Sequence, residues 1–433
     1  MDDRAGTPPT LFDWEFASDP YPAYGWLREH APVYRTTVPS GVEAWLVTRY
    51  AEAREALADG RLSKNPVHHA ESPGARGKTG IPGERSADLM THLLNIDPPD
   101  HTRLRRLVSK AFTPRRVAEF EPRVRELADR FVDGMLRDGT GQADLIHEFA
   151  FPLPIYAICD LLGVPAEDQD DFRDWAGMMM RHVKPGQGGG PRGGVARAVK
   201  RIRTYLVELI ERKRATLGEE SAADDLISGL IRASDHGEHL TGNEAAAMCF
   251  VLLFAGFETT VNLIGNGMHT LFRHPAQRAA LQQALARGDH ALLDPAVEEL
   301  LRYDGPVEMA TWRYATRPLT IGGRPIAAGD PVLVVLAAAD RDPARFDAPG
   351  TVDLARRDNP HLGYGHGIHY CLGAPLARLE ARTAFATLLT RLPDLRLAAD
   401  PAELRWRGGL IMRGLRTLPV AFTPGTAPAA QGK

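Results

Sequence analysis

The chain has 433 residues, of which 44% are hydrophobic and 25% are charged, and its formal net charge at pH 7 is -3. These values are typical of a folded globular protein and exclude a strongly basic, nucleic-acid-binding character overall. The cysteines are sparse and odd in number, which argues against a disulfide framework and for a reducing compartment; they are Cys159, Cys249 and Cys371.

The apolar runs of the chain predict neither a signal peptide nor a membrane span. The N-terminus begins Met1-Asp-Asp-Arg, without an apolar segment. The longest apolar run, residues 245–257, is too short to cross a bilayer. We therefore expect a soluble, cytoplasmic protein, with a flexible N-terminus over residues 1–14, a single folded domain over residues 15–423 and a disordered tail over residues 424–433.

The first part of the chain combines short helices with short strands. Its pattern predicts a helix from residue 19, strands at residues 33–36 and 44–48, a helix at residues 50–58 and a loop over residues 64–83.

A basic amphipathic helix is predicted over residues 101–112. His101 and Arg105 are four residues apart in it and therefore share one face. From this spacing alone, a solvated basic face is the simpler interpretation. The apolar side chains of Leu89, Met90 and Leu94 precede the helix.

The middle of the chain is helical by pattern, and a glycine-rich linker at residues 184–194 interrupts it. The predicted helices cover residues 122–136, 145–162, 168–183 and 195–216. The longest helix follows, from the capping box Thr241-Gly-Asn-Glu244 to about His274.

The centre of that longest helix carries polar groups in an apolar run. It reads Phe254-Ala255-Gly-Phe-Glu258-Thr259-Thr260. A buried carboxylate is costly unless it has a partner or a function. The residues alone leave two interpretations open, a locally satisfied polar kink and a functional site.

The last third of the chain mixes a helix with short strands. A helix over residues 294–303 carries Glu299 and Arg302, which are three residues apart and can pair. Strands are predicted at residues 319–321, 324–326 and 332–336.

A thiol stands at the end of a glycine-rich turn, His361-Leu-Gly-Tyr-Gly-His-Gly-Ile-His-Tyr-Cys371-Leu-Gly373, where a helix begins. An apolar stripe predicts that helix, and Pro375 suits its first turn. The stripe consists of Leu372, Leu376, Leu379, Ala386, Leu389 and Leu392. The free N–H groups and the dipole of a helix N-terminus favour a thiolate at Cys371.

The glycines of this stretch allow a tight turn and a close approach to a flat object. A thiolate held rigidly in this way is a suitable ligand for haem iron. Two alternatives remain on the residues alone. One is a buried structural cysteine, and the other is a small metal site made by His361, His366, His369 and Cys371.

The pattern Tyr364, Gly367, His369, Cys371 and Gly373 resembles the haem-binding loop of the cytochrome P-450 family. It departs from the family at Tyr364, where phenylalanine is usual. The centre of the longest helix resembles the family's oxygen-activation motif, and Glu299-x-x-Arg302 resembles its structural ion pair. The motifs occur in the family's order, and the resemblance covers roughly residues 15–420.

The resemblance implies a mainly helical catalytic domain with a small β region, and haem b between the longest helix and the helix after Cys371. It implies that Cys371 is the iron ligand and that Glu258 and Thr259 deliver protons to bound oxygen, with room left by Ala255. It also implies a set of residues that hold the haem, which are His101, Arg105, Arg313, His369, Tyr364, Gly365 and Gly373.

The resemblance further implies partners and a substrate class. Electrons are expected from a ferredoxin and its reductase, which dock on the basic side chains of Arg103, Arg106, Lys110, Arg115 and Arg116. The helices on either side of the linker at residues 184–194 are expected to form a mobile lid over the substrate channel. We expect a monomer that binds neither nucleic acid nor membrane.

Within the family, the stretches 303–311 and 261–264 are most similar to actinobacterial enzymes that hydroxylate macrolide and related polyketide intermediates. The expected reaction is therefore hydroxylation, or epoxidation, of a bulky lipophilic product. Terpenoid, peptide and fatty-acid substrates are alternatives, as is a haem-based sensor without enzymatic activity. The expected pocket residues are apolar; they are Leu89, Met90, Leu94, Phe254, Val307, Met309 and Ile411.

Overall fold

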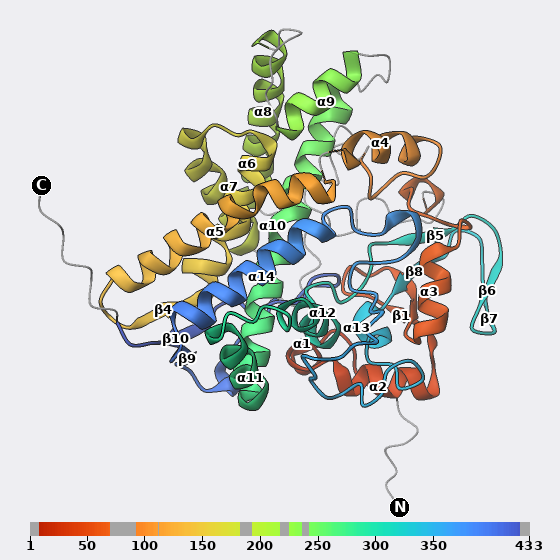
Figure 1. Ribbon diagram of the computed structural model, residues 1–433. Helices are drawn as coiled ribbons and strands as arrows, with labels where there is room; N and C mark the ends of the chain where they lie inside the picture. Colours follow the sequence, from red (N-terminus) through yellow and green to blue (C-terminus); the bar gives the residue numbers. More distant parts are fainter. Residues whose placement is uncertain are drawn as a thin grey trace, which may run out of the picture.

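The computed structural model describes residues 8–69, 92–110, 112–181, 193–216, 225–235 and 242–424. Most of them are helical, with short strands gathered at one side (Figure 1). The mainly helical class with a small β region is thus confirmed. Leu89 and Met90, the linker between residues 184 and 192, and both tails, residues 1–7 and 425–433, lie outside the described residues.

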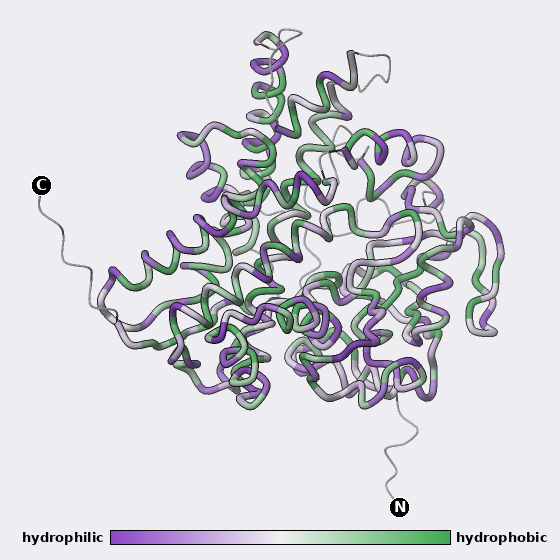
Figure 2. Tube along the Cα trace, in the orientation of Figure 1, coloured by the Kyte–Doolittle hydropathy of each residue, from purple (hydrophilic) through white to green (hydrophobic). Residues whose placement is uncertain are grey.

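Helix α10 (Gly242–Arg273) runs through the middle of the molecule, and α14 (Ala374–Arg391) lies against it (Figure 1). Gly267 permits this close packing, since a Cβ there would come within 2.5 Å of the Phe385 ring. Helix α10 is long and apolar enough to cross a membrane, but 72% of its most apolar window is buried inside the protein. It is therefore explained as a core helix, and Figure 2 shows its apolar residues in the interior.

The other helices pack around this pair or against the sheet. Helices α5, α6, α8 and α12 contact α10 or α14. The remaining described helices are α1 (Trp14–Ser18), α2 (Tyr21–His30), α3 (Tyr50–Ala58), α4 (Asp100–Ser109), α5 (Pro114–Arg137), α6 (Pro152–Leu162), α7 (Gln169–Arg181), α8 (Gly193–Thr216), α9 (Leu226–Asp235), α11 (Pro275–Ala286), α12 (Leu293–Asp304) and α13 (Leu336–Ala339).

The largest sheet joins segments that are far apart in the chain. Its order is β1-β2-β8-β5-β3, with β2 parallel to β8 and the other neighbours antiparallel. Its strands are β1 (Val33–Thr37), β2 (Glu43–Val47), β3 (Leu62–Ser63), β5 (Arg313–Ala315) and β8 (Pro331–Val334). In the β3–β5 pair, Ser63 lies opposite Tyr314, so the residues after β3 run beside the start of β5.

Two smaller sheets complete the β structure. One has the order β4-β10-β9, and the other is the hairpin β6-β7. Their strands are β4 (Gln142–Asp144), β6 (Leu319–Ile321), β7 (Arg324–Ile326), β9 (Arg396–Leu397) and β10 (Pro419–Ala421).

Two predicted helices differ in extent from the observed ones. Helix α5 begins at Pro114, capped by Thr113, and Pro122 lies inside it rather than at its start. The predicted helix over residues 145–162 is divided into a π-helical turn, η4 (Ile146–Ala150), and α6. Proline at residue 152 explains the division, since it is accepted at the start of a helix but not in its interior.

A buried ion pair connects α12 to the segment that leads to the cysteine loop, as predicted. Arg302 Nε lies 2.7 Å from Glu299 Oε2, and neither side chain is exposed to solvent. Arg302 also donates to the carbonyl oxygens of Asp340, Pro349 and Thr351. The pair therefore fixes the segment that precedes the cysteine loop.

Replacing Glu299 by Ala would leave the Arg302 guanidinium buried without its carboxylate. We expect a loss of about 3–5 kcal/mol in the free energy of unfolding, the cost of an uncompensated buried charge. Denaturant unfolding followed by circular dichroism measures it. The control is Asp294→Ala on the same helix, which breaks an exposed pair with Arg382 and should cost less than about 1 kcal/mol. Equal losses in the two variants would contradict this role.

Candidate active site

The cysteine loop is a tight turn pressed against α3. Gly365 and Gly367 both have φ of 76°, a backbone conformation that favours glycine. A Cβ at Gly367 would also come within 3.2 Å of the Ala58 backbone. The turn is closed by the Cys371 N–H, which donates to the Tyr364 carbonyl oxygen at 2.8 Å. The loop thereby holds Cys371 in one place.

The third predicted glycine behaves differently. Gly373 has φ of -83°, so the chain does not need glycine there in order to turn. A Cβ at Gly373 would meet no protein atom within 4 Å, because it would point into open space. Gly373 and Cys371 line the same cavity, so the absence of a side chain at Gly373 leaves room beside the thiol for a flat group.

The Cys371 thiol lies where the sequence places it, just before α14, whose first turn contains Pro375. The thiol is accessible from a cavity. Burial raises its pKa, while the N–H groups of Gly373 and Ala374 and the charges of Arg105 and Arg378 lower it; the net direction is upward. The predicted N–H donors are present and favour the thiolate, while burial opposes it in the protein without a metal ion. A bound metal cation would reverse the balance.

The cavity measures about 420 Å³ and lies between α10 on one side and the cysteine loop with the start of α14 on the other. Of the predicted pocket residues, Leu94, Phe254, Val307 and Ile411 line it. The prediction for Met309 is wrong: its side chain is 1% exposed and packs in a separate apolar cluster with residues such as Phe16 and Trp312. The neighbouring residues Pro306, Val307, Ala310 and Thr311 line the cavity, whereas Met309 faces the other cluster.

Every side chain predicted to bind the haem propionates lines this cavity: His101, Arg105, Arg313 and His369. The rings of His101 and His369 lie 4.3 Å apart between centroids. His101 Nε2 is buried and has no hydrogen-bond partner among the described residues. Arg313 is 3% exposed, and its guanidinium donates over long distances, 3.3 Å and 3.4 Å, to the backbone carbonyl oxygens of Thr311 and Leu57.

Lys64 joins this group, and the sequence analysis missed it. It is 3% exposed, and its Nζ donates to the carbonyl oxygens of Thr311 at 2.8 Å and Trp312 at 2.7 Å. The pairing of β3 with β5 brings it beside Arg313. No local pattern marks Lys64, because its environment is created by a strand that is about 250 residues further along the chain.

The pKa shifts in this cationic cluster show that it lacks anionic partners. The cluster consists of Lys64, His101, Arg105, Arg313 and His369. Burial lowers the pKa of Arg313 to about 10, and burial with the charge of Lys64 lowers the pKa of His369 to about 2. Burial and Arg313 hold the pKa of Lys64 well below its usual range. Burial and mutual repulsion thus disfavour the charged forms of these bases, and anions in the site would stabilise those forms.

Within the part of the chain that the structure describes, Asp97 is the carboxylate that acts on Lys64, His101 and Arg313. Its oxygens are occupied by the Ser63 hydroxyl and, at 2.9 Å, by the Lys64 N–H. The orphaned His101 Nε2 and the weakly bound Arg313 therefore fit two further carboxylates. Together with Cys371 and the open space at Gly373, they fit a haem with its propionates directed at the cluster.

The opposite wall is the centre of α10. Ala255 is exposed to the cavity, and the Thr259 hydroxyl donates to the Ala255 carbonyl oxygen at 2.8 Å. Glu258 is 9% exposed; burial raises the pKa of its carboxyl, and Arg407 at 4.0 Å lowers it. An acid and an alcohol thus face the cavity on the wall opposite the thiol.

Tyr364 stands at the place of the usual phenylalanine and lines the cavity. Its ring is 8% exposed, and the Arg378 guanidinium lies 4.4 Å from the ring centroid. The hydroxyl is buried without a partner among the described residues. The ring therefore lies between the cavity and the Arg378 guanidinium.

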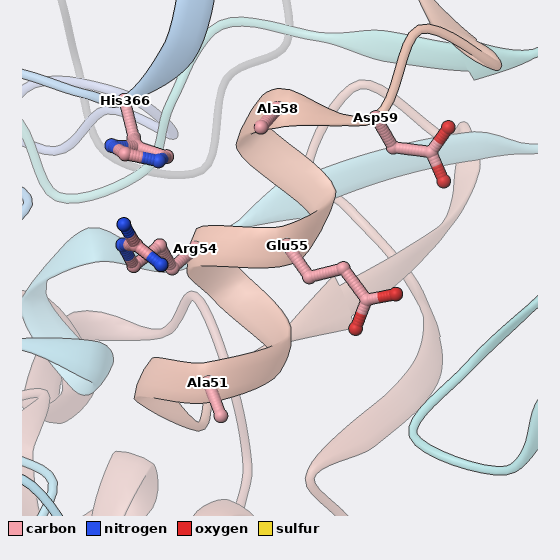
Figure 3. Close-up of a pocket in the computed structure, with 6 residues that line it drawn as sticks. All are labelled: Ala51, Arg54, Glu55, Ala58, Asp59 and His366. Carbon is pink, nitrogen blue, oxygen red and sulfur yellow. The ribbon is translucent and has the colours of Figure 1, made fainter.

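A second hollow, of about 390 Å³, lies on the outer side of the cysteine loop. Figure 3 shows Arg54 and His366 facing one another across it, while Glu55 and Asp59 point away. It is shallow, and its charged side chains are not deeply buried.

These positions also decide against a small metal site made by the loop histidines. His366 faces Arg54, and His361 Nε2 contacts Glu298 at 2.9 Å. Over the described ranges, no group of three or more His, Cys, Asp or Glu side chains could hold a metal ion.

A thiol at a helix start, a buried cationic cluster and an acid–alcohol pair around one cavity define a haem-thiolate protein. The family model of cytochrome P-450 matches residues 192–393. The chain is 47% identical over 412 residues to cytochrome P-450 monooxygenase PikC of Streptomyces venezuelae, covering 95% of this chain and 93% of that protein. It is 41% identical over 402 residues to the mycinamicin IV hydroxylase/epoxidase of Micromonospora griseorubida, with coverages of 92% and 94%.

Among solved structures, the tirandamycin C-bound P-450 monooxygenase TamI is similar, with a TM-score of 0.83 and 41% identity over 96% of this chain and all of that one. The chain therefore belongs to the cytochrome P-450 family. It is a haem b monooxygenase that acts on a small lipophilic substrate with O2 and redox partners.

Replacing Cys371 by Ser should remove the thiolate ligand and with it the red-shifted Soret band of the reduced CO complex, which depends on sulfur donation to the iron. Absorbance spectroscopy of the purified variant measures this. The control is Cys249→Ser, since Cys249 is buried in α10 and is not among the residues that line the cavity. A Cys371→Ser protein that keeps the red-shifted band would show that the sulfur ligand lies elsewhere.

Proposed function

We propose that this monooxygenase inserts one oxygen atom into a C–H bond of a bulky, neutral polyketide intermediate, a macrolide being the first candidate. The proposal rests on the cavity next to the Cys371 thiol. Part of its wall is apolar, with Leu94, Phe254, Val307 and Ile411 among the lining residues. Apolar walls bind neutral ligands by burying apolar surface. Relatives that hydroxylate or epoxidise macrolide and polyketide substrates support the choice.

The bound haem supplies the iron that takes up electrons and activates O2. Around it, Cys371 is the proposed iron ligand, and His101, Arg105, Arg313 and His369 hold the propionates by charge-assisted hydrogen bonds. Lys64 adds positive charge to that site. Tyr364, Gly365 and Gly373 form the surface on which the flat ring lies.

The polar residues in the centre of α10 supply the protons that the reaction consumes. Inserting one oxygen atom of O2 and reducing the other to water consumes two electrons and two protons. Glu258 holds a proton close to the cavity, and the Thr259 hydroxyl, half-buried at the cavity surface, passes it on through water. Ala255, with its small side chain, leaves the space that oxygen needs.

Electrons are proposed to come from a ferredoxin. The exposed apolar residues Ile368 and Tyr370 stand beside Cys371, at 52% and 39% exposure. Helix α4, which carries basic side chains of the predicted docking set, contacts this loop, since the Arg105 guanidinium donates to the Tyr370 carbonyl oxygen at 2.7 Å. Arg103 is an exception to the predicted docking set, since it pairs with Glu244 of α10 at 2.6 Å. We propose that the protein works as a monomer in the cytoplasm.

A ligand panel tests the substrate class. A macrolactone should displace iron-bound water and shift the ferric haem spin state, as followed by absorbance. Ile411→Ala should weaken that binding by about tenfold or more, through lost apolar contact, and leave the reduced CO spectrum unchanged. Val207→Ala, an exposed position on α8, is the control. Binding of sterols or fatty acids instead of macrolactones would contradict the polyketide assignment.

Replacing Thr259 by Ala removes the hydroxyl that passes protons. Reductant consumption should continue, while product formed per reductant falls about tenfold or more and hydrogen peroxide rises. Product and peroxide assays on one sample measure both. Thr270→Val on the same helix, away from the cavity, is the control. Wild-type coupling in Thr259→Ala would show that another group passes the proton.

A further inference from the structure

A second cavity, of about 410 Å³, lies between η4, α7 and the C-terminal segment. The charged side chains at its mouth are exposed; they are His147, Glu148, Arg173 and Asp174. Arg407 lines this outer cavity and also the main cavity. Among the described residues, Arg407 is the one that lines both, so its side chain lies between the outer cavity and the active-site cavity.

The backbone of Arg407 is fixed. Its N–H donates to the Gly414 carbonyl oxygen at 2.7 Å, and the neighbouring Trp406 is bridged to Leu415. The side chain is held less tightly. Its Nη1 lies 4.0 Å from Glu258 Oε1, beyond hydrogen-bonding distance, and is buried without a partner among the described residues. The guanidinium can therefore turn between the two cavities while its backbone stays in place.

Asn262 continues the polar line one turn beyond Glu258 on α10. It is 1% exposed, lines the main cavity, and neither atom of its amide has a hydrogen-bond partner in the described chain. The C-terminal segment passes so close that a Cβ at Gly414 would come within 2.1 Å of its Oδ1. Buried amides of this kind are satisfied by ordered water. Arg407, Glu258 and Asn262 thus mark a polar seam between α10 and the C-terminal segment.

The charges that reach Arg407 come from several elements. Glu258 on α10 and Asp144 on β4 favour its charged form, and Arg416 of the C-terminal segment opposes it. The outer cavity adds Arg173 and Asp174 from α7. Arg407 therefore has the carboxylate of Glu258 on the active-site side and those of Glu148 and Asp174 on the solvent side. The guanidinium would find a carboxylate in either of two positions, toward the active site or toward the outer cavity.

We propose that Arg407 gates the route by which solvent protons reach Glu258. Turned toward Glu258, the guanidinium closes the seam; turned toward the outer cavity, it lets water connect Glu258 with solvent, so that the carboxyl regains the proton it has given up. Arg407 stays charged and transfers no proton itself. The proposal deepens the proposed function, because it rests on the role of Glu258 in supplying protons.

The test uses the full-length haem protein and replaces Arg407 by Met, which is apolar and interrupts the water line. We expect kcat to fall about tenfold, with a larger solvent deuterium isotope effect and an unchanged KM, since proton transfer slows but substrate binding does not. Arg407→Lys should recover part of the rate. Arg405→Met is the matched control, because Arg405 lies on the same segment but is exposed over the Trp14 ring.

A second readout needs no turnover. Infrared titration of the resting protein follows the protonated carboxyl of Glu258, identified by its loss in Glu258→Gln. Because Arg407 lowers the pKa of this carboxyl, the band in Arg407→Met should persist to higher pH than in the wild type. In Arg405→Met it should titrate as in the wild type.

The outcomes separate the two claims. If Glu258→Gln retains wild-type turnover and coupling, the proton role of Glu258 fails, and the gate fails with it. If Glu258→Gln is impaired while Arg407→Met keeps the wild-type isotope effect and the wild-type infrared titration, only the gate is overturned. A slowed Arg407→Met with an enlarged isotope effect and a displaced titration supports it.

Discussion

The structure depends on a set of buried basic side chains whose charged forms need more anionic partners than the described part of the protein supplies. His101, Arg105, Arg313 and His369 line one cavity, Lys64 lies beside Arg313, and Asp97 is already engaged by Ser63 and the Lys64 backbone. Burial and mutual repulsion lower the pKa of Arg313 and His369. Such an arrangement is costly until anions enter it, so the folded chain is completed by a dianionic cofactor.

The surrounding architecture keeps this cluster and the thiol at a fixed separation. The β3–β5 pairing joins Lys64 to Arg313, and the Glu299–Arg302 pair fixes the segment before the cysteine loop. Gly267 lets α10 and α14 pack closely, which sets the acid–alcohol wall opposite the thiol. The proposed routes for protons and electrons therefore lie on different sides of the cavity, since Glu258 lies on the α10 wall and Ile368 and Tyr370 are exposed beside Cys371.

Local patterns were enough to predict the long helices, the helix start after Cys371, the glycine turn and the spacing of His101 and Arg105. They could not predict contacts made across the chain. Lys64 is buried by a strand near residue 313, Met309 packs in a separate apolar cluster, and Arg407 meets Glu258 only through the C-terminal segment. The effect of burial on the Cys371 pKa could not be predicted locally either, because burial depends on the whole fold.

The most direct test compares haem b with its dimethyl ester, which keeps the ring and iron but carries no propionate charge. Apoprotein from haem-deficient cells would be titrated with each and the binding followed by absorbance. The ester should bind about 100-fold more weakly or worse, since charge-assisted hydrogen bonds contribute about 1.5–3 kcal/mol each. Equal affinity for the two compounds would show that the buried cations do not hold the cofactor, and would contradict the account.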